Sequence, residues 1–304
     1  MKMTVTMAWK RATLSKKLQI KGYLFLLPFM IYFLAFILVP FLYSVTLSLT
    51  DFNLLKGQIK FVGLENYISL LGSSFLYKVL LNTFYFIIPV VVGWIVIGLM
   101  VGLLLNQRVP GRDFFRFVVY IPVVIDWIVV SLIWTYIFDP TFGLANFVLR
   151  GMGLPAHHFL QSSTEAMPTL IATALWKGFG YYAVFYLAGL QDIPLQLYDA
   201  AQIDGAGPIR TFFSVVLPQL APVTTFVVLM ALINAFQFFD PFYLMTGGGP
   251  VQSTTVLIFQ YYQVSFGYME LGSGSTLAMI FTLIVFLLLL LARRSLMRTA
   301  GAID

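Results

Sequence analysis

Six long runs of apolar residues constrain this chain more than any other feature, because each is long enough to cross a membrane. A membrane-spanning helix needs about 20 mostly apolar residues. The runs lie at 23–44, 82–105, 115–137, 168–190, 219–238 and 274–292. Only 10% of the residues are charged, whereas about 25% are charged in a typical soluble protein. We therefore predict an all-α, polytopic membrane protein with six transmembrane helices.

The first apolar run predicts a membrane span and not a cleaved signal peptide. It continues well beyond the roughly 7–15 apolar residues of a signal peptide, and no small-residue cleavage site of the A-x-A kind ends it. The predicted organisation is a cytoplasmic tail at 1–22, a six-helix domain at 23–292 and a second cytoplasmic tail at 293–304.

The distribution of Lys and Arg predicts the orientation of the spans, since cytoplasmic segments are enriched in these residues. Thirteen of the eighteen Lys and Arg residues lie on one predicted side. They are Lys2, Lys10, Arg11, Lys16, Lys17, Lys21, Arg108, Arg112, Arg116, Arg210, Arg293, Arg294 and Arg298. Four lie on the other side, and Lys177 lies within a span. Both termini are thus predicted to be cytoplasmic, and the net charge of +6 indicates topology, not a nucleic-acid surface.

The sequence lacks the residues and motifs needed for thiol chemistry, for zinc-dependent proteolysis of the HExxH type and for ATP binding. The chain has no cysteine, and its two histidines, His157 and His158, are adjacent and form no HExxH motif. It also has no G-x-x-x-x-G-K-[ST] loop to hold ATP phosphates. We expect no catalytic residue, no metal site and no cofactor in this chain.

A polar segment, DAAQIDGAGPIRTFFSVVLP at 199–218, interrupts the apolar runs on the predicted cytoplasmic side. Its two alanines favour a helix with little side-chain bulk. Gly205 is placed to end that helix, and Pro208 suits the first position of a second one. The pattern predicts a short helix, a sharp turn and another short helix. It fits a solvated loop, or an element that docks into a cleft of another protein.

This segment resembles the EAA motif of the permease subunits of binding-protein-dependent ABC importers. The family pattern reads E-A-A, three residues, G, nine residues, I, one residue, L-P. Here Asp199 replaces the usual Glu and Val215 replaces Ile, while the spacing is kept. The resemblance implies that the segment 191–218 contacts an ATPase subunit. The residues it assigns to coupling are Asp199, Ala200, Ala201, Asp204, Gly205, Leu217 and Pro218.

Three further stretches, FVGLENY, DPTFGLAN and TGGGPVQSTTVLIFQYYQVSF, resemble the carbohydrate-uptake branch of this family, of the first-subunit type found in maltose and glycerol-3-phosphate permeases. The resemblance implies a type I importer permease in the bacterial inner membrane. It implies as partners a second homologous permease, two ATPase subunits that bind ATP and Mg²⁺, an extracytoplasmic solute-binding protein and a sugar.

Polar and aromatic residues within the spans are candidates for the sugar site, since such residues usually face a cavity or the bundle interior. The candidates are Trp127, Asp126, Gly178, Tyr181, Asn234 and Gln237. Gly178, Tyr181 and Asn234, and more loosely Trp127, fall where the resemblance implies sugar contacts. Helix–helix packing is the alternative for each, and Gly98 and Gly102 carry the GxxxG spacing of close packing. Asp126 and Lys177 are a candidate ion pair.

Other functions remain open at this point. A polyol or glycerol-phosphate importer would use the same architecture. An ion-coupled transporter would need several carboxylates within the spans, and Asp126 is the one clear candidate. An intramembrane enzyme would need a cluster of catalytic groups in the spans, which the sequence does not provide.

Overall fold

The computed structural model describes residues 18–19, 21–107 and 110–300, with side chains described as far as Ala292. Most of the predicted N-terminal tail, Arg108 and residues 301–304 lie outside these ranges. The described part is mostly helical and contains isolated β-bridges but no strand. This agrees with the all-α fold class.

The helices follow one another along the chain with short connections. The first runs over Lys21–Ser48, with a π-helical turn at Leu34–Leu38, and its last part is α2 (Val39–Ser48). The others are α3 (Glu65–Leu71), α4 (Ser74–Asn106), α5 (Arg112–Val124), α6 (Trp127–Ile137), α7 (Leu144–Gly151), α8 (Ala166–Gln191), α9 (Leu195–Ile203), α10 (Pro208–Thr211), α11 (Leu217–Gln219), α12 (Ala221–Phe236), α13 (Leu257–Tyr262) and α14 (Leu271–Ala300).

Three described helices are long and apolar enough to cross a membrane: Lys21–Ser48, α4 and the Leu271–Ala292 part of α14. Two further candidates are bent pairs. The α5–α6 pair bends by 97°, and Pro208–Gln219 meets α12 at 67°. The predicted span 115–137 is therefore a broken helix. The predicted span 168–190 is the helix α8. It is long enough to cross a membrane, but it is less apolar than the three helices above.

Helix α8 lies at the centre of the bundle, and glycines allow its close packing on three neighbours. A Cβ atom at Gly98 of α4 would lie 2.9 Å from Tyr182 Cβ, and one at Gly102 would lie 3.0 Å from Tyr186 Cβ. Within α8, Gly180 faces the backbone of α5, and Gly189 faces Val223 of α12. The close packing expected from the Gly98–Gly102 spacing is confirmed.

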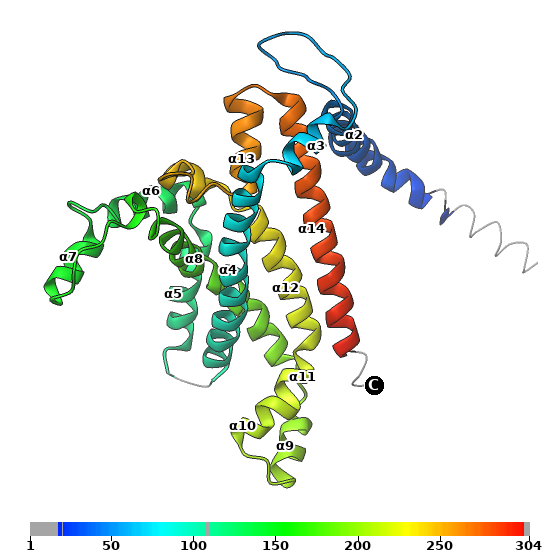
Figure 1. The fold of residues 1–304 in the computed structure, drawn as a ribbon. Helices are drawn as coiled ribbons and strands as arrows, with labels where there is room; N and C mark the ends of the chain where they lie inside the picture. The colour runs from blue at the N-terminus through cyan, green and yellow to red at the C-terminus, as the bar shows by residue number, and fades with distance from the viewer. Residues whose placement is uncertain (1–17, 20, 108–109, 301–304) are drawn as a thin grey trace, which may run out of the picture.

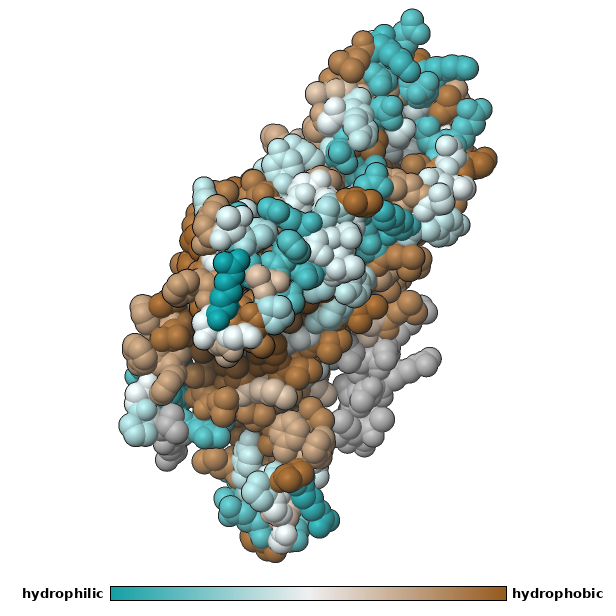
Figure 2. Space-filling view, turned by 60° about the vertical axis from the view of Figure 1, so that its left-hand side comes forward, coloured by the Kyte–Doolittle hydropathy of each residue, from teal (hydrophilic) through white to brown (hydrophobic). Residues whose placement is uncertain are grey.

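The two ends of the bundle differ in character. Helices α9, α10 and α11 project from one end, near the C-terminal end of α14, whereas α3 and α13 lie at the opposite end (Figure 1). Between these ends, a broad belt of apolar side chains crosses the face shown in Figure 2, with more polar surface above and below it. This distribution is the one expected of a protein with its middle in lipid.

Candidate functional site

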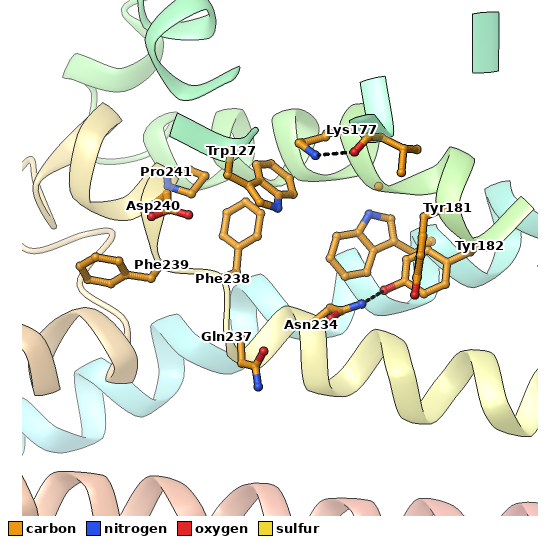
Figure 3. Close-up of a pocket in the computed structure, with 13 residues that line it drawn as sticks. Trp127, Lys177, Tyr181, Tyr182, Asn234, Gln237, Phe238, Phe239, Asp240 and Pro241 are labelled. Carbon is orange, nitrogen blue, oxygen red and sulfur yellow. Dashed lines mark hydrogen bonds between the residues drawn. The ribbon is translucent and has the colours of Figure 1, made fainter. Parts of the chain in front are cut away.

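A cavity of about 400 Å³ opens midway along the bundle where α5 breaks from α6. Its walls come from α4, the α5–α6 break, α8 and the end of α12 (Figure 3). The lining residues are Trp94, Val123, Trp127, Lys177, Gly178, Tyr181, Tyr182, Asn234, Gln237, Phe238, Phe239, Asp240 and Pro241. Five of the six residues predicted for the sugar site thus lie around one cavity.

Aromatic rings form most of the apolar wall. The Trp127 ring stands edge-on to Phe238 with 4.6 Å between centroids, and Trp94 stacks on Tyr182 at 5.1 Å. Tyr181 lies edge-on to Tyr182 at 5.2 Å and is only partly buried. Flat rings of this kind offer apolar faces to a ligand while their polar edges can form hydrogen bonds.

Lys177 supplies a cation at this wall. Its side chain is 7% exposed, and Nζ lies 4.5 Å from the centroid of the Trp127 ring. Nζ donates one long hydrogen bond, of 3.4 Å, to the backbone oxygen of Val123. An ammonium group has three donors, so Lys177 can donate to a ligand in the cavity. Asp240 lies on the far side of Trp127 from Lys177 (Figure 3).

Amide side chains occupy the α12 side of the cavity. Asn234 Nδ2 donates a hydrogen bond of 3.0 Å to the hydroxyl of Tyr182, which fixes the direction of the amide (Figure 3). Gln237 is exposed at the edge of the cavity. Gly178 lies against the Trp94 indole, and a Cβ atom there would collide with that ring. Glycine at 178 therefore allows the Trp94 indole to lie directly against α8 in the cavity wall.

Asp126 is the predicted site residue that does not line the cavity. It is exposed, and its Oδ1 accepts a hydrogen bond of 2.8 Å from Ile128 N, so that it caps the N-terminus of α6. Within the described part of the chain, Lys177 forms no ion pair within 4.0 Å. The candidate Asp126–Lys177 ion pair is therefore not formed. The Asp126 carboxylate instead caps the N-terminus of α6, a helix end that exists because the span is broken there.

The predicted coupling segment forms the projecting tip. Asp199, Ala200 and Ala201 belong to α9, and Asp204 follows its last residue. Gly205 has a φ of +71°, a value that glycine adopts without strain, and its N–H bonds to Gln202 O at 3.0 Å. Helix α10 starts at Pro208, and Leu217 and Pro218 begin α11. The predicted helix–turn–helix is confirmed.

A polar clamp fixes the loop at the opposite end of α8. Glu165 accepts a hydrogen bond of 2.7 Å from Phe159 N and lies 3.1 Å from His157 Nδ1. Burial alone would raise the pKa of Glu165, but the bonds from His157 and from the Phe159 backbone outweigh it and lower that pKa below its ordinary value. Asn146 completes the clamp by bonding to the backbone of His157 in both directions.

Comparison with known proteins defines the family. Residues 94–298 match the model of the family described as "Binding-protein-dependent transport system inner membrane component". The chain belongs to this family. The permease is 34% identical over 273 residues, 88% of its length and 93% of the relative's, to "Probable ABC transporter permease protein YurN" of Bacillus subtilis (strain 168). It is 33% identical over 269 residues, 88% and 90% of the two chains, to "sn-glycerol-3-phosphate transport system permease protein UgpA" of Shigella flexneri.

Solved structures share the fold of the permease. A chain from a bacterial ABC transporter involved in the import of the acidic polysaccharide alginate superposes with a TM-score of 0.82 at 21% identity, covering 95% of the permease and 99% of that chain. A chain of the MetNI methionine ABC transporter superposes with a TM-score of 0.51 at 18% identity, covering 75% and 99%. The predicted type I importer architecture is therefore supported at the level of the fold.

Sequence reasoning missed part of the cavity wall of the permease. Trp94, Phe238 and Asp240 line the cavity but were not predicted to, whereas Lys177 and Tyr182 belong to the same polar stretch of the fourth span as Gly178 and Tyr181. The Asp240 carboxylate, placed directly after a predicted span, was a usable signal. Trp94 had none, because its role depends on how α4 packs against α8.

Proposed function

We propose that the permease forms half of the translocation pathway of an ATP-driven sugar importer, and that the central cavity binds the transported sugar. The cavity itself carries this proposal. Trp127 and Tyr181 offer aromatic faces to the apolar side of a sugar ring. Asn234, Gln237 and Lys177 offer hydrogen bonds to its hydroxyl groups. Few polar groups among apolar walls are typical of small-molecule sites.

The proposed arrangement has six spans at 23–292 and cytoplasmic tails at 1–22 and 293–304. Helix α8 is included as the fourth span because α4, α5 and α12 surround it, which removes the need for a fully apolar surface. The positive-inside rule supports cytoplasmic termini. Arg210 of α10 lies at the tip, near the C-terminal end of α14.

The projecting tip is proposed to be the coupling element, with the role assigned to Asp199, Ala200, Ala201, Asp204, Gly205, Leu217 and Pro218. Its surface supports a protein partner. Four large apolar side chains on it are more than half exposed, although the tip lies beyond the apolar belt. They are Leu195, Ile203, Ile209 and Phe213. Apolar surface gathered at a polar end is typical of an interaction site.

The proposed partners are a second homologous permease, two ATPase subunits and an extracytoplasmic solute-binding protein. ATP and Mg²⁺ would be bound by the ATPase subunits, and this chain would act on no nucleic acid and hold no cofactor. The family description names a binding-protein-dependent system. One similar structure is a bacterial alginate ABC transporter in complex with a periplasmic protein that holds an alginate pentasaccharide.

We propose a neutral sugar as the cargo, because the lining carries one cation, Lys177, and one carboxylate, Asp240. A polyol or glycerol-phosphate cargo is the second candidate, which Lys177 and the similarity to glycerol-3-phosphate permeases favour. Competition separates the two. Excess glycerol 3-phosphate should leave sugar uptake by the complete transporter unchanged, whereas strong inhibition would favour the second candidate.

A pair of substitutions at the tip tests the coupling role. Gly205→Arg adds a bulky cation at a position with a φ of +71° and should abolish uptake in cells. Gly205→Asn is the matched control, because Asn tolerates this conformation and adds little bulk. Both variants should insert into the membrane. Normal uptake with Gly205→Arg would contradict coupling through this turn.

A further inference from the structure

A second, larger cavity lies apart from the sugar site, in a groove between α5 and the last turns of α8. It has a volume of about 830 Å³ and is lined mainly by apolar side chains. Phe117, Tyr120, Ile121, Val124, Val184 and Leu187 are among them. It shares no lining residue with the sugar cavity. Any ligand of the groove must therefore be apolar along most of its length.

Two arginines mark one end of this groove. Arg116 lines it together with Gln191, the last residue of α8. With its amide oxygen turned toward the arginines, Gln191 accepts hydrogen bonds of 2.9 Å from Arg112 and 3.2 Å from Arg116. The Nε atoms of both arginines are buried and have no hydrogen-bond partner among the described residues. A further acceptor would therefore be met by the Nη groups, which carry four of the five N–H donors of each guanidinium.

The positive charges of the two arginines are not balanced by buried carboxylates among the described residues. Asp113 Oδ1 lies 3.7 Å from Arg116 Nη1, but the Asp113 side chain is 98% exposed. Arg116 therefore has one solvated carboxylate within 4.0 Å, and Arg112 has none among the described residues. Guanidinium groups match the oxygens of a phosphate group and can bind them in pairs.

The length of the groove fits one leaflet of a bilayer. From Arg116 to Val124 the rise of α5 is about 12 Å at 1.5 Å per residue. One leaflet of the hydrocarbon core is about 15 Å thick, half of about 30 Å. Since the arginines lie at the proposed cytoplasmic border, the groove runs from headgroup depth toward the middle of the membrane.

We infer that the α5–α8 groove binds an anionic phospholipid of the cytoplasmic leaflet. Its phosphate group is held by Arg112 and Arg116, and one acyl chain lies along Tyr120, Val124 and Val184. Basic pockets between spans on the cytoplasmic side suit such headgroups, because the anionic lipid surface and the arginines attract each other. The inference concerns a lipid site beside the pathway and does not depend on the identity of the cargo.

Native mass spectrometry of the complete transporter with added phosphatidylglycerol or phosphatidylcholine tests this inference. The wild type should retain phosphatidylglycerol with a preference of about tenfold. The Arg112→Gln/Arg116→Gln pair should lose the preference, and Val184→Trp, which fills the groove, should reduce retention of both lipids. Arg150→Gln, on the outer helix α7, is the matched control and should behave as wild type.

Three results would overturn the inference. The first is equal retention of both lipids by the wild type. The second is binding of inorganic phosphate that displaces no lipid and that Val184→Trp leaves unchanged, which would indicate a phosphate site alone. The third is loss of the second permease from the Val184→Trp complex with lipid retention unchanged, which would identify the groove as a subunit interface.

Discussion

The Lys21–Ser48 helix and α8 are of similar length but have opposite surroundings. The first has 28 residues, and none within its most apolar stretch is buried. The second has 26 residues, of which fourteen are buried, among them Lys177 and two threonines. A helix that faces lipid along its length must be apolar all round, whereas a shielded helix can carry polar groups inward. Of these two helices, the shielded one lines the central cavity.

The largest expected difference follows from placing a charge in the exposed apolar helix Lys21–Ser48. Phe36 is 69% exposed near its middle. Phe36→Lys should weaken insertion of this span by about 2.5–3.5 kcal/mol, although α8 carries Lys177 in the shielded interior. Membrane-inserted protein after expression measures the effect, with Phe36→Leu as the control. Insertion of Phe36→Lys at the wild-type level would contradict the claim that this helix, unlike α8, does not tolerate a charge.

Added side-chain volume should destabilise the α4–α8 contact but not the exposed Lys21–Ser48 helix. Gly98→Leu would force the new side chain into Tyr182 and the Ala183 backbone of α8, with an expected cost of about 1–3 kcal/mol. Gly22→Leu is the matched control, because nothing lies within 4 Å of a Cβ atom there. Thermal unfolding in detergent should show a lower transition temperature only for Gly98→Leu. Equal shifts for both would contradict close α4–α8 packing.

A smaller effect is expected from one polar contact that fixes α8 on α4. Trp94 Nε1 donates a hydrogen bond of 2.9 Å to the backbone oxygen of Ala174. Trp94→Phe keeps an aromatic ring but removes the donor, so stability should fall by about 0.5–1.5 kcal/mol. Trp134→Phe is the control, because no hydrogen bond from its indole occurs within the described part of the chain. An unchanged transition temperature for Trp94→Phe would show that this bond adds nothing.

The smallest effect is expected at the N-terminal end of α8 and should depend on pH. The pKa of Glu165 is lowered in the folded protein, so its contribution to stability is present above its ordinary value of about 4.5 and is lost as pH falls through the folded value. Glu165→Gln should therefore lower the unfolding temperature at pH 7, and the difference from wild type should shrink below pH 4.5. Glu270→Gln serves as the control. A difference that grows on acidification would contradict the sign of the shift.

Local features were predictable from the sequence, and features that depend on packing were not. The turn at Gly205 and the start of α10 at Pro208 follow from residues only a few positions apart. Gly178, Tyr181 and Asn234 were placed around one site by their polarity and by the family resemblance. Asp126 does not line the cavity, because the extended backbone at Ile125 and Asp126 breaks the span and makes the carboxylate a helix cap. The role of Trp94 depends on α4–α8 packing, which sequence periodicity does not specify.

Replacement of Trp127 tests most directly whether the shielded helices enclose the sugar site. Trp127→Leu keeps apolar bulk but removes the ring that faces Lys177 and Phe238. In the reconstituted transporter, uptake of the sugar that its binding protein retains should fall by about threefold to tenfold, with complex assembly unchanged. Trp176→Leu, at a tryptophan outside the cavity lining, should transport normally. Wild-type uptake by Trp127→Leu, or equal loss in both variants, would contradict the assignment of the cavity.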